Sequence, residues 1–189
     1  KLLAHSVSFG IPLSGCKQNG RGGGANTNAN GLKFEQDTDL MTVATCKGEI
    51  NKWADEVFFG EGLFTVPKKK TGLFNIVKPV LPKDQQSPWL QATDECYIRD
   101  SDKVIFILEK KYQQCGGSVC EKLQTTVFKQ DHMRELFPSH RVVYFYCLSD
   151  WYKENAKAEL KFLEKNDIKV FWGSDPEYKE KVVSYLNSY

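Results

Sequence analysis

The sequence predicts an α/β fold in which a mixed central β-sheet is flanked by α-helices. In the second half of the chain, short segments rich in β-branched and aromatic residues alternate with amphipathic segments, which is typical of parallel strands joined by helices. In the first half, strand-like segments follow one another with turns between them, which favours antiparallel pairing. Because the chain has 189 residues, of which 41% are hydrophobic, we expect a single well-packed domain over residues 1–189.

The composition argues against a membrane protein and against a disordered chain. No apolar run is long enough to cross a membrane, and the hydrophobic content is that of a globular protein. The formal net charge is only +2, so a nucleic acid would have to bind a local basic patch. The six cysteines lack the paired spacing of a zinc site, which favours reduced thiols, and we expect a cytoplasmic protein without a signal peptide.

The first regular element is expected after residues 15–31, a segment dominated by glycine and asparagine. Glycine is entropically costly to order and asparagine competes for backbone hydrogen bonds, so this segment predicts a loop. A helix is then expected from about Leu32 to Thr45. Its apolar side chains would be Leu32, Phe34, Leu40 and Met41.

Two strands are expected next, around a basic turn. Residues 55–66 and 72–80 are rich in aromatic and β-branched side chains, and Pro67–Gly72 between them contains a run of lysines. A hairpin follows, in which Asp94 lies on one strand and Glu109 on the other. The turn between these two strands is expected at Asp100–Asp102.

The rest of the chain reads as helix, strand, helix, strand and helix. The first of these helices is opened by the capping-box pattern Ser118–Glu121 and ends near Leu136. The remaining elements are a strand over 141–148, a helix over 150–166, a strand over 168–172 and a last helix capped by Ser174–Glu177. Strands separated by a helix predict parallel pairing with a right-handed crossover.

Charged residues gather where the two hairpin strands meet. Thr93-Asp94-Glu95-Cys96 opens one strand, and the apolar run Lys103–Lys111 ends in Glu-Lys-Lys on the other. Because side chains alternate between the faces of a strand, Glu109 and Lys111 point to the same face. A buried strand that ends in two charges on one face is seldom only a core element. Asp94 lies on the adjacent strand, so the two carboxylates can meet.

These residue types suit phosphodiester hydrolysis with a divalent cation. Asp94 and Glu109 supply hard oxygen ligands for Mg²⁺, and the main-chain carbonyl of Lys110 is a third candidate ligand. Lys111 would orient the attacking water or stabilise the developing negative charge. The alternative is a solvated hairpin rim, because Glu-x-Lys at a strand end is common. Glu95 takes the place of Asp94 if the strand register slips by one residue.

Four short motifs together resemble the PD-(D/E)xK nucleases, and more narrowly the small type II restriction endonucleases. They are Asn30-Gly-Leu-x-Phe-Glu35, Thr93-Asp94-Glu95-x-Tyr97-Ile98, Ile107-Leu-Glu109-x-Lys111 and Gly117-Ser-x-x-Glu121-Lys-Leu. The likeness spans roughly residues 24 to 148 of this chain. At the first position of the second motif, Thr93 stands where the family usually has a proline.

The resemblance implies a restriction-endonuclease-like fold with Asp94, Glu109 and Lys111 as catalytic residues. Glu35 matches the helix carboxylate that supports the metal site in this family. The implied activity is sequence-specific cleavage of double-stranded DNA by metal-activated water, with Mg²⁺ as cofactor, Mn²⁺ as a substitute ion and a homodimer as the active form. Two alternatives remain open: a structure-selective repair or junction nuclease of the same fold, and a non-catalytic DNA-binding module.

Two segments and one helix start are candidate DNA contacts. Lysines of the basic turn would contact phosphates, although a solvated turn is the simpler explanation of any one of them. These are Lys68, Lys69 and Lys70. Residues of the glycine- and asparagine-rich segment would contact bases, because Arg pairs with guanine and Asn with adenine through two hydrogen bonds each. These are Arg21, Asn26, Asn28 and Asn30. The alternative is that this segment is a plain linker. Ser118 begins a capped helix whose N–H groups would face a phosphate.

Overall fold

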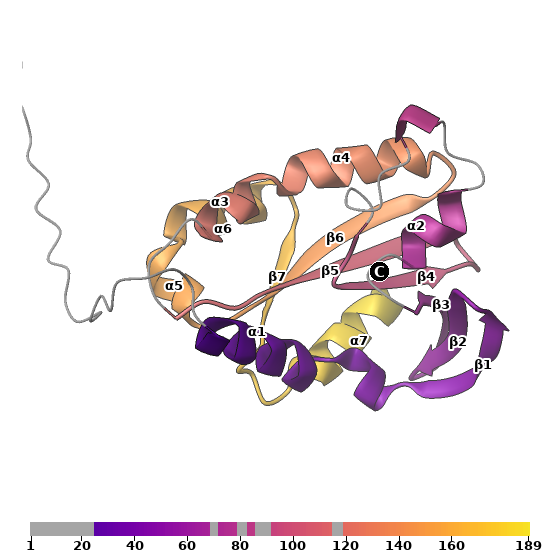
Figure 1. The fold of residues 1–189 in the computed structure, drawn as a ribbon, viewed down its shortest axis with the longest axis horizontal. Helices are drawn as coiled ribbons and strands as arrows, with labels where there is room; N and C mark the ends of the chain where they lie inside the picture. Colours follow the sequence, from indigo (N-terminus) through magenta and orange to yellow (C-terminus); the bar gives the residue numbers. More distant parts are fainter. Residues whose placement is uncertain (1–24, 69–71, 79–82, 86–91, 115–118) are drawn as a thin grey trace, which may run out of the picture.

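The computed structural model describes residues 25–68, 72–78, 83–85, 92–114 and 119–189. Within these residues, seven strands form one sheet in the order β1-β2-β3-β4-β5-β6-β7 (Figure 1). The strands are β1 (Thr45–Asn51), β2 (Ala54–Phe59), β3 (Gly62–Pro67), β4 (Glu95–Arg99), β5 (Val104–Lys111), β6 (Arg141–Leu148) and β7 (Lys169–Trp172). Neighbouring strands from β1 to β5 are antiparallel, whereas β5, β6 and β7 are parallel. The expected mixed sheet is confirmed.

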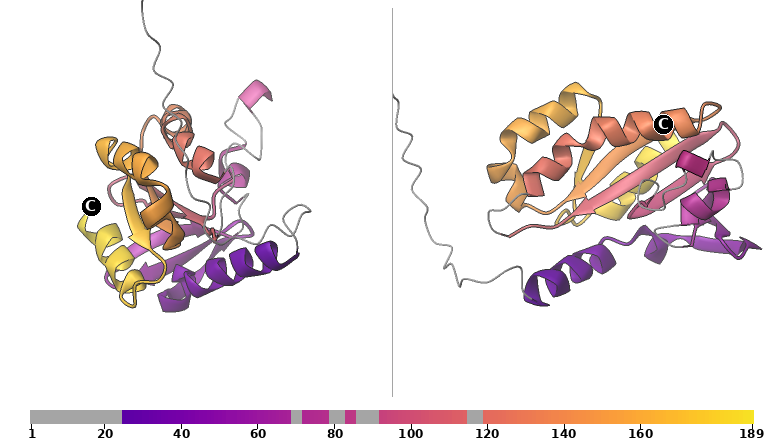
Figure 2. Two further views of the ribbon diagram at one scale, coloured as in Figure 1. Left: turned by 90° about the vertical axis from the view of Figure 1, so that its left-hand side faces the viewer. Right: turned by 45° about the horizontal axis from the view of Figure 1, so that its top comes forward.

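Helices cover both faces of this sheet, as the sequence predicts. They are α1 (Ala25–Asp37), α2 (Gly72–Val77), α3 (Val119–Gln124), α4 (Thr126–Leu136), α5 (Trp151–Asn155), α6 (Lys157–Lys165) and α7 (Tyr178–Ser188), with short 3-10 helices η1 (Leu40–Val43) and η3 (Lys83–Gln85). Helices α2 and α4 pack on one face, and α3, α5 and α6 extend this layer over β6. On the other face lie α7 and η1. Figure 2 shows the indigo α1 on the opposite side of the sheet from the orange helices.

The central strand β5 is buried on both faces because each face contacts a different helix. Ile105 and Ile107 belong to the cluster that contains Met133 of α4. Phe106 and Leu108 belong to the cluster that contains residues of α7. This explains why β5 reads as a nearly continuous apolar run instead of an alternating one. The face that a residue of β5 occupies therefore decides which helices its side chain meets.

The first helix begins and ends earlier than the sequence predicts. α1 starts at Ala25 and ends at Asp37, so the expectation of a loop over residues 25–31 was wrong. Most glycines of the segment precede Ala25, and the alanines, asparagines and threonine that follow are tolerated in a helix at modest cost. Residues 15–24 lie outside the described part. The helix stops before Asp39, whose side chain caps η1.

Of the four apolar side chains expected to anchor this helix, only Phe34 does so from within α1. Leu40 is buried and Phe34 packs against the core, whereas Leu32 is 59% exposed and Met41 is 38% exposed. Leu40 and Met41 belong to η1 rather than to α1.

The strands expected over 55–66 and 72–80 were also partly wrong. Residues 55–66 hold a hairpin of two strands, β2 and β3, whose turn uses Gly60 at a φ of +61° that favours glycine. In the second segment, residues 72–77 form α2, because Leu73 is buried against the sheet face that α4 also covers. Strand β1 was not expected, since it is exposed along nearly its whole length and has no apolar alternation.

The second half follows the prediction more closely. Strand β6 has the expected bounds, and both β5–β6 and β6–β7 are parallel. The two long helices that the sequence predicts, from Ser118 to Leu136 and over 150–166, are each divided into two shorter ones, at Thr125 and at Ala156. Ser118 lies outside the described residues. None of the helices in the described ranges is long and apolar enough to cross a bilayer.

Candidate active site

Asp94, Glu109 and Lys111 lie together at the end of the β4–β5 hairpin. Asp94 directly precedes β4, and Glu109 and Lys111 close β5 on the face that α4 covers. The Lys111 ammonium donates to Asp94 Oδ2 at 3.0 Å, to Glu109 Oε2 at 2.6 Å and to the main-chain oxygen of Lys110 at 3.0 Å. The alternation of β5 and its pairing with β4 thus bring the three predicted residues into direct contact.

The positive charge of Lys111 is stabilised by the neighbouring carboxylates. Burial by itself lowers the pKa of Lys111, but the attraction of Glu109 and then of Asp94 outweighs it. The pKa of Lys111 consequently lies above the ordinary value of lysine, and the side chain is an ammonium at neutral pH. Its side chain is 17% exposed, so the charge lies close to the surface without being freely solvated.

Glu109 is the most deeply buried carboxylate of the site, with 4% of its side chain exposed. Its second oxygen accepts a hydrogen bond from the Tyr144 hydroxyl at 3.3 Å and lies 3.6 Å from Nζ of Lys129 on α4. Burial and the neighbouring Glu109 charge raise the pKa of Tyr144, so this hydroxyl keeps its proton and remains a donor. A buried carboxylate needs such partners to remain charged.

The register of the hairpin places Asp94, and not Glu95, beside Glu109. The N–H of Lys110 donates to Asp94 Oδ2 at 2.8 Å, which fixes this carboxylate against the end of β5. Glu95 points to the opposite face, where it is ion-paired with the Lys110 ammonium and accepts a hydrogen bond from Tyr97. The alternative in which Glu95 takes the place of Asp94 beside Glu109 therefore does not match the observed register.

Glu35 approaches the site from α1. Its main-chain oxygen accepts a hydrogen bond from the Lys110 ammonium at 3.0 Å, which ties α1 to the end of β5. Glu35 lines two cavities that Asp94 also lines, one of about 420 Å³ and one of about 520 Å³. Glu35 thus lies on a helix, as the sequence predicts, and the role of its carboxylate in supporting the metal site stays a prediction.

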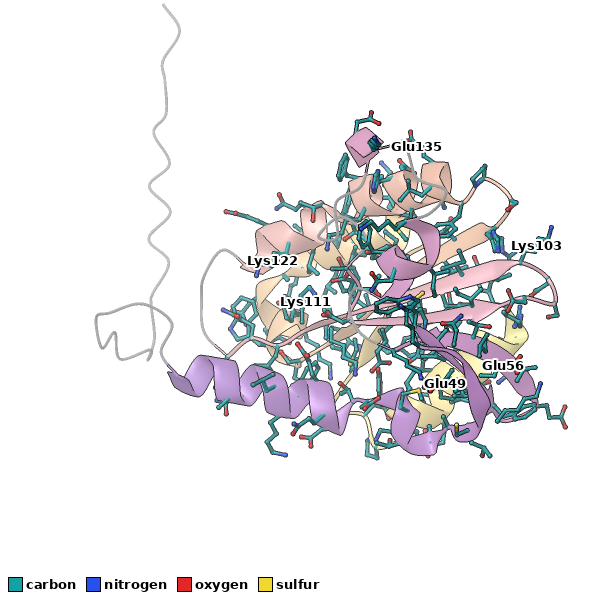
Figure 3. All side chains as sticks on the ribbon, turned by 45° about the vertical axis from the view of Figure 1, so that its right-hand side comes forward. Glu49, Glu56, Lys103, Lys111, Lys122 and Glu135 are labelled. Atoms are coloured by element: carbon teal, nitrogen blue, oxygen red, sulfur yellow. The ribbon has the colours of Figure 1, made fainter. Side chains whose placement is uncertain are left out.

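The 520 Å³ cavity contains two lysines that sequence reasoning missed. Lys122 of α3 and Lys129 of α4 line it together with Lys111, Glu35 and Asp94. Figure 3 shows Lys111 and Lys122 on the side of the molecule between α1 and α3. In the structure, Lys122 and Lys129 lie on two helices that are separated at Thr125. In the single helix expected from the sequence, their spacing of about two turns puts them on one face. That spacing was the available signal.

Among the other candidate DNA contacts, the side chains of Asn30 and Lys68 are described. Asn30 is on α1, and its side chain donates to Oε1 of Gln114 at 3.2 Å. Lys68 is ion-paired with Glu49 at 2.6 Å and with Asp55 at 3.1 Å, so it stabilises the β1–β3 sheet edge. Asn26 and Asn28 fall in α1, but their side chains are not described. Outside the described residues are Arg21, Lys69, Lys70 and Ser118.

The donor set around Lys111 suits a hard divalent cation. Two carboxylate oxygens and one carbonyl oxygen already converge on a positive charge, and Mg²⁺ prefers such oxygens together with water. In the part of the chain that the structure describes, no three His, Cys, Asp or Glu side chains are grouped so as to hold a metal. A metal here would be held by Asp94, Glu109, the Lys110 carbonyl and water, and the ammonium would have to move aside.

The chain matches no protein-family model, no curated protein and no solved structure. No relative therefore assigns a role to these residues, and their geometry is the basis for a function.

Proposed function

We propose that this protein is a Mg²⁺-dependent deoxyribonuclease that hydrolyses phosphodiester bonds. The observation that carries the proposal is the convergence of Asp94, Glu109 and the Lys110 carbonyl on a single positive charge. Buried carboxylates at this spacing are costly unless a cation is held between them. A site that holds a cation with oxygen ligands, and keeps a lysine beside it, has the components of phosphoryl-group hydrolysis.

The neighbouring cavity supports a phosphate as the group that reacts. Four lysines line it together with Glu35 and Asp94: Lys110, Lys111, Lys122 and Lys129. Of these, Lys110 is ion-paired with Glu95. Lys122 is exposed and Lys129 is partly exposed, which leaves both able to meet a ligand from solvent. A polyanionic backbone gains affinity from each such contact by releasing bound counterions. The net charge of the chain is only +2, so this local concentration of lysines is a feature of the site.

Each residue has a distinct role in the proposed reaction. Bound Mg²⁺ would supply Lewis-acid polarisation of the phosphate and lower the pKa of water. Asp94 and Glu109 would hold the ion, and the Tyr144 hydroxyl, which donates to Glu109, would keep that carboxylate in position. Lys111 keeps its proton at neutral pH and donates it in a hydrogen bond to the attacking water or to a phosphoryl oxygen. Lys129 offsets negative charge at the phosphate from the side of α4.

The finer proposal is a type II restriction endonuclease with a restriction-endonuclease-like fold that cuts specific sequences in double-stranded DNA as a homodimer. It is supported by the order of elements: a helix with Glu35, antiparallel strands of which two carry the carboxylates, and then a helix and a parallel strand. The resemblance of the motifs to that family points the same way. A structure-selective nuclease of the same fold is the alternative that the experiment below separates.

The test is incubation of long DNA of known sequence with the protein, in Mg²⁺ and separately in EDTA. We expect reproducible fragments only with Mg²⁺, and loss of cleavage by at least about a hundredfold in Asp94→Asn and Glu109→Gln. Asp131→Asn is the matched control, because this exposed carboxylate on α4 is paired with Arg134 at 3.1 Å and lies outside the cavity. Cutting of branched DNA alone would favour the structure-selective alternative. Full activity in both site variants, or cleavage in EDTA, would refute the assignment.

A further inference from the structure

In addition to the two cavities that Glu35 lines, a cavity of about 620 Å³ lies at the carboxyl ends of the three parallel strands. Gln113 follows β5, Asp150 follows β6 and Ser174 follows β7, and all three line it. Because the strands run in the same direction, these three segments must reach the same edge of the sheet. The carboxyl edge of parallel strands is where α/β proteins commonly bind ligands. Its volume is in the range of small-molecule sites.

This cavity adjoins the lysine-lined cavity of the active site. Phe34, Tyr112 and Gln113 line both of them, and Tyr112 directly follows Lys111. The two spaces differ in charge. One is lined by four lysines together with Glu35 and Asp94, whereas the described residues that line the other include Asp37 and Asp150 and no lysine. A phosphate is therefore favoured in the first, and an uncharged group with hydrogen-bond donors in the second.

The walls of the 620 Å³ cavity are held by a network of described contacts. The Ser149 hydroxyl accepts a hydrogen bond from the N–H of Gln113 at 3.0 Å and donates one to its carbonyl at 3.1 Å. Asp150 Oδ1 accepts from the Ser174 hydroxyl at 2.7 Å and pairs with Lys153 at 2.6 Å. Residues fixed in this way present their polar groups in constant positions, which recognition of a ligand requires.

Aromatic rings complete the cavity. The rings of Phe34 and Tyr112 lie 5.4 Å apart between centroids, and Trp151 lines the same space from the start of α5. Flat rings provide stacking surfaces for a planar ligand. An amide such as that of Gln113 pairs with adenine through two hydrogen bonds, and a carboxylate such as that of Asp150 accepts from the amino group of cytosine.

We infer that this cavity binds a nucleobase of the DNA whose backbone phosphate lies at Lys111, and that Gln113, Asp150 and Trp151 determine base preference. The inference rests on the proposed nuclease function and adds to it the place where bases are read. The base edge comes either from a paired base in the major groove or from a base turned out of the stack. Both sources present the same hydrogen-bonding groups.

The experiment measures base enrichment when a random-sequence duplex library binds to Asp94→Asn, a variant that keeps the cavity and is expected not to cut. We expect enrichment of one base at a position close to the bound phosphate. Adding Asp150→Asn or Trp151→Ala should reduce that enrichment about tenfold. The Asp131→Asn change is the matched control and should leave it unaltered. A second library, with one base left unpaired, separates the sources: stronger enrichment there indicates an extruded base, and equal enrichment indicates reading in the groove.

The inference and the proposed function fail in different ways. Equal enrichment in the parent and in both Asp150→Asn and Trp151→Ala, with wild-type cleavage intact, would overturn the base-reading site alone. Base-selective binding that these variants weaken, without any cleavage by the wild-type protein in Mg²⁺, would overturn the nuclease function alone. Gln113→Glu, which changes one atom of a side chain, replaces Trp151→Ala in the comparison if the latter variant does not fold by circular dichroism.

Discussion

Replacing Lys111 with methionine should convert Mg²⁺ from a weak into a strong stabiliser of the fold. In the wild-type protein, the ammonium occupies the space between Asp94 and Glu109, at 3.0 Å and 2.6 Å from their oxygens. Methionine fills a similar volume without charge, so two carboxylates would face each other without a cation. Removal of one partner from a buried ion pair costs about 3–5 kcal/mol. Since Asp94 is partly exposed, with 15% of its side chain accessible, we expect about 2–3 kcal/mol here.

The predicted change in stability can be measured both without and with Mg²⁺. Without Mg²⁺, the melting temperature of Lys111→Met should fall by roughly 5–10 °C for a chain of this size. Added Mg²⁺ at about 100 times its dissociation constant would restore about 2.7 kcal/mol to the free energy of unfolding. In the wild-type protein the same ion must displace the ammonium, so we expect its affinity to be at least about tenfold lower, which is about 1.4 kcal/mol.

The assay is urea unfolding and thermal melting across a Mg²⁺ titration, with NaCl at matched ionic strength as the salt control. Lys122→Met is the matched variant, because it removes an ammonium from the same cavity without touching either carboxylate. Its response to Mg²⁺ should resemble that of the wild type. Equal stabilisation of the wild type and Lys111→Met, or none in either, would show that these oxygens do not form a cation site. Catalysis plays no part in this measurement.

Two predictions concern contacts outside the candidate site, and a third concerns Lys129 within it. Asp102→Asn should cost about 0.5–1 kcal/mol at pH 7, because Arg99 makes two 2.7 Å contacts to this carboxylate and lowers its pKa. The difference in stability between the wild type and the variant should therefore shrink as the pH drops below about 3.8, and urea unfolding at several pH values would detect this. Gly173→Ala should destabilise by about 1–3 kcal/mol, since a Cβ would lie 2.6 Å from Cζ of Phe34, and an unchanged melting temperature would contradict this packing. Lys129→Ala should weaken DNA binding and reduce the slope of log affinity against log salt concentration by about one. An unchanged slope would place this lysine away from the phosphate.

The positions of the candidate site carboxylates, Asp94 and Glu109, were predictable because two simple rules determine them. Alternation along β5 puts Glu109 and Lys111 on one face, and a short hairpin puts Asp94 opposite. The second half of the sheet was predictable for a related reason, since strands such as β6, buried on both faces, have long apolar runs that bound them clearly.

The misassigned elements lack such a signal or are decided by distant contacts. Strand β1 is exposed along nearly its whole length, so its side chains show no alternation of polar and apolar residues. Residues 72–77 have strand-like composition, yet they form α2 because Leu73 packs under the sheet. Lys122 and Lys129 were missed since lysines on a helix are usually solvated; their cavity exists only once α1 and β5 are in place.

The end of β5 shows why the register of the hairpin matters for function. Lys111 holds Asp94 and Glu109 on the face of α4, while Lys110 holds Glu95 and the Glu35 carbonyl on the face of α1. A slip of one residue between β4 and β5 would exchange the carboxylates between the faces and break both sets of contacts. A buried charge that loses its partner destabilises the fold. The two sets of ion pairs together therefore penalise every register but the observed one. The same contacts that assemble the proposed metal ligands therefore also specify how this part of the chain folds.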